Sequence, residues 1–151
     1  MYQHILVPTD GSAAARTASS HAVDLAALCE AEIHALHVID TDAMTHTVRS
    51  TTITQLEAGQ LDEHPEAYTR AKNATHDVVA TANEAGVEAT QSIAAGRPHT
   101  EIIEYARTND IDLIVMGSRG HSGVSRLLLG STTQRVIKKT SIPVLVVDTT
   151  K

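Results

Sequence analysis

Aromatic side chains are almost absent from this 151-residue sequence. It contains no Phe and no Trp, and its only aromatic residues are Tyr2, Tyr68 and Tyr105. Proteins that bind single-stranded nucleic acid stack bases on aromatic side chains, so a stacking platform of this kind is excluded. Because 42% of the residues are hydrophobic, we expect a core built from aliphatic side chains.

Positive charge is also scarce. The sequence has 12 Lys and Arg against 18 Asp and Glu, which gives a formal net charge of -6 and a pI near 5.8. Basic residues cluster only at Arg135, Lys138 and Lys139. Without a basic surface to neutralise a phosphate backbone, DNA and RNA are not expected as partners.

The single cysteine and the short apolar runs narrow the class of protein further. Cys29 cannot form an internal disulfide, and it shares a predicted helix face with Ala22 and Leu25, which is typical of a small core residue. No apolar run approaches the roughly 20 residues that span a bilayer. Met1 leads directly into the strand-like YQHILV, without the features of a secretion signal. We therefore expect a cytoplasmic protein with no membrane insertion.

Apolar runs alternate with helical patterns along the chain, whose length fits one domain over residues 1–151. The runs predict strands over 4–7, 33–39, 87–94, 113–116 and 143–147. Helical spacing predicts helices around 18–29, over 67–85 with an end at Gly86, from about Pro98, and after Ser131. This order predicts an α/β fold, a doubly wound five-stranded parallel sheet with helices on both faces.

One segment, about 40–65, is irregular and contains THTVRSTTIT, followed by a predicted short helix around 55–61. Connections of this length are often functional lids. A solvated surface insertion explains the same composition, and both interpretations stay open.

Distinctive residues follow the first and fourth predicted strands. The first ends in PTDGS, residues 8–12, and the fourth is followed by Gly117 and the residues after it. In doubly wound sheets, ligands bind beyond the carboxyl ends of the strands, where the strand order reverses. The residues alone do not set the strand order. With the order 3-2-1-4-5, these two ends would flank the ligand site.

The stretch GSRGHSGVSRLLLGSTTQRV, residues 117–136, has the composition of a phosphate-binding loop. Gly117 and Gly120 allow close backbone approach and a positive φ. Gly130 precedes Ser131–Thr133, and the first amides of the helix that opens there would attract an anion. An ordinary turn at Gly117, a short helix over 124–129 that stops at Gly130, and Ser131 as an N-cap form the alternative. Both interpretations fit this stretch.

Two common nucleotide motifs are absent: the sequence has no Walker A loop, and no Gly-x-Gly-x-x-Gly follows the first strand. The spacing of Gly117, Gly120, Gly130 and Ser131 instead resembles the glycine signature of the ATP-binding branch of the universal stress protein family. The segments HILVPTDGS, IHALHVID, DLIVMGSRGHSG and SIPVLVV resemble the same family. The resemblance covers nearly the whole chain apart from 40–65.

This resemblance implies a fold, a ligand and an assembly. The implied fold is flavodoxin-like with strand order 3-2-1-4-5, similar to adenine nucleotide alpha hydrolases. The implied ligand is ATP, ADP or AMP, with Mg²⁺ or Mn²⁺ held mainly by the phosphates. The implied assembly is a homodimer through the fifth strand, Ser141 to Asp148.

The resemblance also implies which residues bind the nucleotide. Adenine would lie near the first and second strand ends, the ribose against the end of the fourth strand, and the phosphates at the glycine loop and the fourth helix. Asp10 would accept a hydrogen bond from adenine or ribose, and it can also cap the turn before Ser12. The implied cofactor-binding residues are Pro8, Thr9, Asp10, Val38, Met116, Gly117, Ser118, Arg119, Gly120, Gly130, Ser131 and Thr132.

Metal-binding and catalytic motifs are weaker. His34 and His37 are three residues apart on a predicted strand, so they point to opposite faces. The other seven histidines show no ligand spacing, and no dedicated metal site is expected. Ser122 lacks the Gly-x-Ser-x-Gly elbow, and no catalytic residue is assigned.

We therefore expect an ATP-binding regulatory protein of the universal stress class, acting as a nucleotide-dependent module in a stress response. Two alternatives stay open. One is a slow ATP hydrolase, because Asp10, Arg119 and His121 would lie near the phosphates. The other is an adaptor for a transporter, a kinase or another regulatory partner, with nucleotide as a switch.

Overall fold

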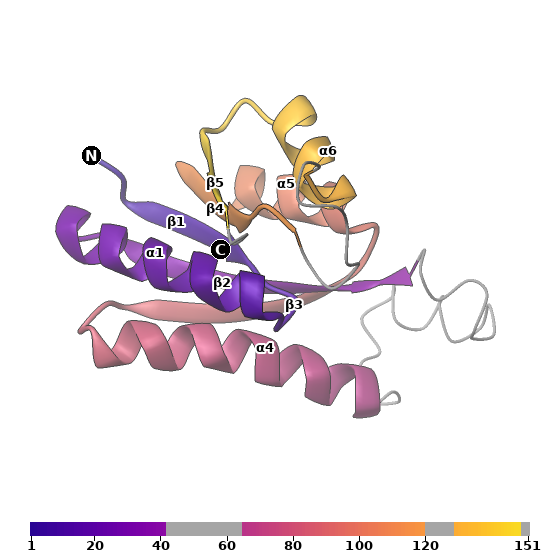
Figure 1. Cartoon of the computed structure of the whole chain (residues 1–151), viewed down its shortest axis with the longest axis horizontal. Helices are drawn as coiled ribbons and strands as arrows, with labels where there is room; N and C mark the ends of the chain where they lie inside the picture. The colour runs from indigo at the N-terminus through magenta and orange to yellow at the C-terminus, as the bar shows by residue number, and fades with distance from the viewer. Residues whose placement is uncertain (42–64, 120–128, 149–151) are drawn as a thin grey trace.

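The computed structural model describes residues 1–41, 65–119 and 129–148 (Figure 1). Strands and helices alternate along these ranges: β1 (His4–Pro8), α1 (Ala13–Cys29), β2 (Glu32–Asp40), α4 (Pro65–Glu84), β3 (Ala89–Gly96), α5 (Pro98–Thr108), β4 (Leu113–Gly117), α6 (Ser131–Lys139) and β5 (Val144–Val147). The predicted alternation is confirmed. The predicted helices at 55–61 and 124–129 and almost all of the irregular segment 40–65 lie outside the described residues, apart from Leu129 and the ends of that segment.

The strands form one parallel sheet with the order β3-β2-β1-β4-β5. β1 lies in the centre, with His4 opposite Glu32 of β2 and Ile5 opposite Leu113 of β4. Helices α1 and α4 cover one face of the sheet, and α5 and α6 cover the other (Figure 1). The predicted doubly wound, flavodoxin-like order 3-2-1-4-5 is therefore confirmed.

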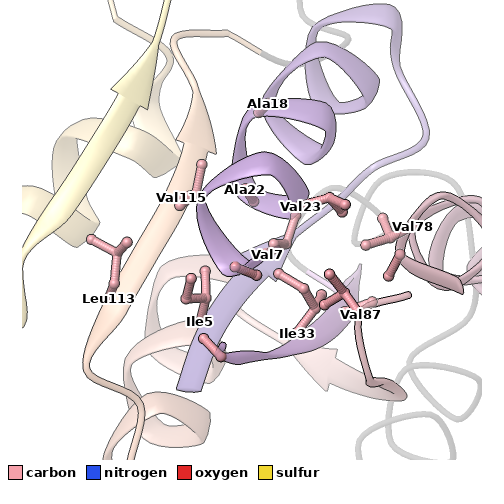
Figure 2. Packing of buried hydrophobic residues seen from close by; sticks show 14 of the residues in the cluster. Ile5, Val7, Ala18, Ala22, Val23, Ile33, Val78, Val87, Leu113 and Val115 are labelled. Carbon is pink, nitrogen blue, oxygen red and sulfur yellow. The ribbon is translucent and has the colours of Figure 1, made fainter. Parts of the chain in front are cut away.

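The core beneath α1 and α4 is aliphatic, as the composition predicts. Figure 2 shows strand residues Ile5 and Val7 packed toward Ala22 and Val23 of α1. Alanines on the inner face of α1 allow this helix to lie close to the sheet, because each places only a methyl group between the helix and the strands. The buried residues labelled in the figure are Ile5, Val7, Ala18, Ala22, Val23, Ile33, Val78, Val87, Leu113 and Val115.

A second core lies beneath α5 and α6. Leu6, Leu36 and Ile114 point to this face from the three central strands and contact Ile102 of α5 and Val136 of α6. Because both faces are covered, consecutive strand residues are buried, which explains the apolar runs without alternation. The described helices include none that could span a lipid bilayer.

The sheet has β5 at one edge, as the predicted strand order requires. β5 covers four residues and begins at Val144, later than predicted, although the Pro143 carbonyl already accepts a hydrogen bond from the Ile114 amide at 3.0 Å. Leu145 in the middle of β5 is 40% exposed. An edge strand with an exposed apolar side chain is available for pairing with another chain.

Candidate functional site

A cavity of about 550 Å³ lies at the carboxyl ends of β1, β2 and β4. This is the edge where the strand order reverses, since β1 leads to β2 on one side and pairs with β4 on the other. Its volume falls within the range typical of small-ligand sites. The residues that line it are Pro8, Thr9, Asp10, Ala15, Leu36, His37, Val38, Ile39, Asp40, Ala67, Arg70, Pro98, Ile102, Met116, Gly117, Arg119, Gly130, Ser131, Thr132 and Thr133.

The turn between β1 and α1 is held by its own side chains. Asp10 Oδ1 accepts from the Ser12 amide at 2.9 Å, and Ser12 Oγ accepts from the Ala15 amide at 3.1 Å as the N-cap of α1. Gly11 has φ +79, a conformation that favours glycine. The predicted capping role of Asp10 is therefore present, and the turn keeps Asp10 at the wall of the cavity.

The end of β2 forms a second wall and is tied to the first. The Thr9 amide donates to the Leu36 carbonyl at 2.8 Å, and His37 Nδ1 lies 2.8 Å from the Thr9 carbonyl oxygen. Val38 lines the cavity beside His37 and Asp40. The adjacent ends of β1 and β2 thus form one hydrogen-bonded wall of the cavity. On the β2 side, Val38 is the one residue that was predicted from the sequence.

The end of β4 contributes a glycine for a steric reason that differs from the predicted one. Gly117 does not have a positive φ. A Cβ added to it would lie 3.2 Å from the Ala14 carbonyl oxygen and 3.3 Å from that of Arg119. Glycine therefore allows the start of α1 to pack closely against β4, beside buried Met116.

The start of α6 forms the remaining wall. Gly130 is its N-cap with φ -60, no side chain among the described residues caps this end, and the first turn contains no acidic residue. Thr133 Oγ1 donates to the Gly117 carbonyl at 3.1 Å, which fixes α6 to the end of β4. The partial positive charge of a helix N-terminus is directed toward the cavity without a carboxylate on the same turn to neutralise it.

The structure brings most of the predicted site residues to this one cavity. Ten of the predicted residues lie in its lining: Pro8, Thr9, Asp10, Val38, Met116, Gly117, Arg119, Gly130, Ser131 and Thr132. Ser118 does not line it; its Oγ is buried and has no hydrogen-bond partner within the described part of the chain. Gly120 and His121 lie outside the described residues.

Other lining residues were missed by reasoning from the sequence. Ala67 and Arg70 come from the first turns of α4, and Pro98 and Ile102 come from α5. They belong to regular helical patterns, so no local signal distinguishes them. They reach the cavity because the carboxyl edge of β2 and β3 lies beside the starts of these helices, which only the packing reveals.

The sheet and cavity define the class of this protein: a doubly wound α/β protein with a ligand-sized cavity at its topological switch point. Comparison with known proteins then gives the family. The model of the Universal stress protein family matches residues 1–148. The chain belongs to this family, and the predicted resemblance is confirmed; the glycine signature within it stays a prediction.

Similar proteins cover this chain almost completely. Universal stress protein MJ0531 of Methanocaldococcus jannaschii is 35% identical over 100% of this chain and 85% of its own length. Universal stress protein MJ0577 of the same organism is 34% identical over 97% of this chain and 95% of its own length. The solved structure of MJ0577 has a TM-score of 0.80 and covers 100% of this chain and 99% of that chain. A universal stress protein solved in complex with cAMP shares the fold, with 24% identity, a TM-score of 0.69, and coverage of 99% of this chain and 98% of that chain.

Proposed function

We propose that this chain binds an adenine nucleotide, ATP or its products ADP and AMP, in the cavity at the carboxyl edge. The observation that carries the proposal is the start of α6, a helix N-terminus without a side-chain cap among the described residues, which opens into a cavity also lined by Leu36, Ile102 and Met116. Membership of the universal stress protein family supports it. In this proposal residues 1–151 form one domain that acts in the cytoplasm as a nucleotide-dependent regulatory module in a stress response.

The base and the ribose would occupy the apolar side of the cavity. Pro8, Thr9 and the backbone of Val38 would contact adenine, while Met116 and Gly117 would contact the ribose. Asp10 would accept from the adenine amino group or from a ribose hydroxyl. A carboxylate offers about four acceptor positions, so the bond from Asp10 to the Ser12 amide at 2.9 Å is compatible with this role.

The phosphates would bind at the start of α6. Backbone amides of Ser131 and Thr132, together with their hydroxyls, would donate to phosphate oxygens, and Gly130 would let them approach. Arg119 and Arg70 line the same cavity and would add positive charge. A Mg²⁺ or Mn²⁺ ion would enter with the phosphates and be held mainly by them.

A charge placed at the start of α6 tests the proposal. Without added nucleotide, Ser131→Asp should leave the melting temperature unchanged or raise it, because an acidic residue in the first turn stabilises a helix by about 0.3–1 kcal/mol. The same carboxylate repels phosphate. In the parent, ATP at a hundredfold excess over Kd stabilises the fold by about 2.7 kcal/mol, and this gain should be lost in the variant.

Ser20→Asp is the matched control, because Ser20 is exposed on α1 and the substitution makes the same change in net charge. Its melting shifts with ATP, ADP and AMP should equal those of the parent. The proposal fails if no nucleotide shifts the parent, or if Ser131→Asp keeps the full shift. Product analysis of the same samples distinguishes binding from the slow ATP hydrolysis that the sequence leaves open.

We also propose that two copies pair through β5. Leu145 is 40% exposed on this edge strand, and β5 pairs within the chain with β4 alone among the described strands. Sedimentation of the parent and of Leu145→Lys tests the pairing: a concentration-dependent dimer is expected for the parent and a monomer for the variant. Equal dimerisation of both would place the interface elsewhere. Any further regulatory partner stays a prediction from the sequence.

A further inference from the structure

A cluster of three metal-ligating side chains lies at the opposite edge of the sheet, where the strands begin. Glu32 Oε1 lies 3.0 Å from His4 Nδ1 and 2.6 Å from His34 Nε2. Ligand atoms of the three residues all lie within 4.8 Å of one another. The cluster shares no residue with the cavity at the carboxyl edge, so it is independent of the proposed nucleotide site.

The sheet itself creates this cluster. The parallel register places His4, the first residue of β1, opposite Glu32, the first residue of β2. Glu32 and His34 are two residues apart on one strand, so their side chains point to the same face of the sheet. The three metal-ligating side chains therefore project from two paired strands. Regular elements of this kind hold a metal site in a defined geometry better than loops do.

His34 is oriented by a residue from a third element. His34 is buried, at 8% exposure for the whole residue, and its Nδ1 lies 2.9 Å from the hydroxyl of Tyr105 on α5. A tyrosine hydroxyl both donates and accepts, so it can pair with either neutral form of the imidazole. A metal ion bound by Nε2 in place of its proton would leave the remaining ring proton on Nδ1, where the Tyr105 hydroxyl can accept it. Metal-bound histidines commonly bond through their second nitrogen in this manner.

The charge of the cluster also suits a cation. Glu32 contributes a carboxylate whose Oε1 contacts both imidazoles. Asp112 lies beside the cluster, where its carboxylate accepts from the amides of Gln3 and His4 at 2.9 and 3.1 Å.

We propose that His4, Glu32 and His34 form a binding site for a divalent transition-metal ion, with Zn²⁺ as the best match. Two imidazoles and one carboxylate are a ligand set that zinc accepts, and three protein ligands leave a fourth position open. Hard ions such as Mg²⁺ prefer all-oxygen ligands and are disfavoured here. A tetrahedral ion with bonds of about 2.1 Å separates its ligands by about 3.4 Å, so the distances of 3.0 and 2.6 Å from Glu32 to the two histidines would each have to widen by less than about 1 Å.

This proposal departs from the expectation that the histidines hold no ion. That expectation rested on spacing along the chain, and His4 is far from Glu32 in sequence. The pattern Glu32-x-His34 is a ligand spacing suited to a strand, but it becomes recognisable only once β1 is known to pair with β2 in this register.

Titration of the chelator-treated, untagged protein with Co²⁺ and Zn²⁺ tests the site, with nucleotide left out so that no ion enters with phosphate. We expect visible Co²⁺ absorption of tetrahedral type for one ion that Zn²⁺ displaces. Glu32→Gln, His34→Gln and His4→Gln should each take up one ion fewer, or bind Zn²⁺ at least tenfold more weakly. Tyr105→Phe should retain binding with affinity reduced by about tenfold, as expected of a positioning residue.

His21→Gln and His76→Gln are the matched controls, because both residues are exposed on helices away from the cluster; their metal uptake should equal that of the parent. Circular dichroism identifies any variant that fails to fold. If His34→Gln does not fold, His4→Gln is the substitute, because His4 is the more exposed histidine of the cluster. Equal uptake by the parent and the folded ligand variants would overturn the proposal, as would binding of Mg²⁺ as tight as that of Zn²⁺.

Discussion

The two ends of the same parallel strands carry different chemistry. At the carboxyl edge, β1 ends at Pro8 and the cavity is lined by apolar side chains, by the charged side chains of Arg70 and Arg119 among others, and by the start of α6. At the amino edge, β1 begins at His4, whose ring contacts a glutamate directly. One edge thus suits a sizeable ligand with an anionic group, and the other suits a single small cation.

The direction of the helices gives the physical reason for this difference. In a β-α-β crossover each helix runs antiparallel to the strands, so helix N-termini gather at the carboxyl edge and C-termini at the amino edge. The N-terminal ends carry partial positive charge and favour anions, while the C-terminal ends favour cations. Individual residues add to this electrostatic preference of the two edges. Gly130 places no side chain over the α6 N-terminus, and Glu32 adds a carboxylate at the opposite edge.

Removing a side chain from the core shared by both edges should have the largest effect. Leu6 is 0% exposed in the middle of β1, and Leu6→Ala should lower the free energy of unfolding by about 2–5 kcal/mol. In urea, the variant should therefore unfold and lose both ligands at lower denaturant concentrations than the parent. Leu28→Ala is the control, because Leu28 on α1 is 84% exposed and its loss should cost little. Equal destabilisation by the two variants would contradict this account of the core.

Combining Ser131→Asp at the carboxyl edge with Glu32→Gln at the amino edge should show that the nucleotide site and the metal site act independently. Ser131→Asp should abolish the ATP-induced stabilisation of about 2.7 kcal/mol at a hundredfold excess while leaving Zn²⁺ uptake intact, and Glu32→Gln should do the reverse. His4 and Pro8 are about 13 Å apart along β1, a separation at which effects usually add within about 0.5 kcal/mol. Melting of both single variants and the double variant with each ligand measures the coupling. A much larger coupling energy would mean that the edges communicate.

The smallest effect concerns the turn at the carboxyl edge alone. Ser12→Ala removes the N-cap of α1 and should destabilise the protein by about 1 kcal/mol, because the Ala15 amide loses its acceptor. Nucleotide affinity should fall slightly and Zn²⁺ uptake should not change. Ser20→Ala, exposed within the same helix, should leave urea unfolding near that of the parent. If Ser12→Ala altered the metal cluster as strongly as the nucleotide site, the local origin of this effect would be refuted.

Much of the carboxyl edge could be predicted from the sequence because its signals are local. PTDGS after the first strand and Gly130-Ser131 before the fourth helix each report on their own backbone, and the family resemblance supplied the strand order that joins them. The steric role of Gly117 was not predictable, because it depends on Ala14 of a neighbouring helix at 3.2 Å. Arg70 was missed for the same reason, since its helix reaches the cavity through packing.

By itself, the sequence determined the alternation of strands and helices, the aliphatic core and the family, because hydrophobic periodicity and capping residues act over a few neighbouring positions. Only the tertiary structure decided which distant residues meet. The register of β1 against β2 placed His4 beside Glu32, and the packing of α4 and α6 closed a cavity around the end of β4. Register and packing are set by contacts summed over the whole sheet, so no short stretch of the chain specifies them.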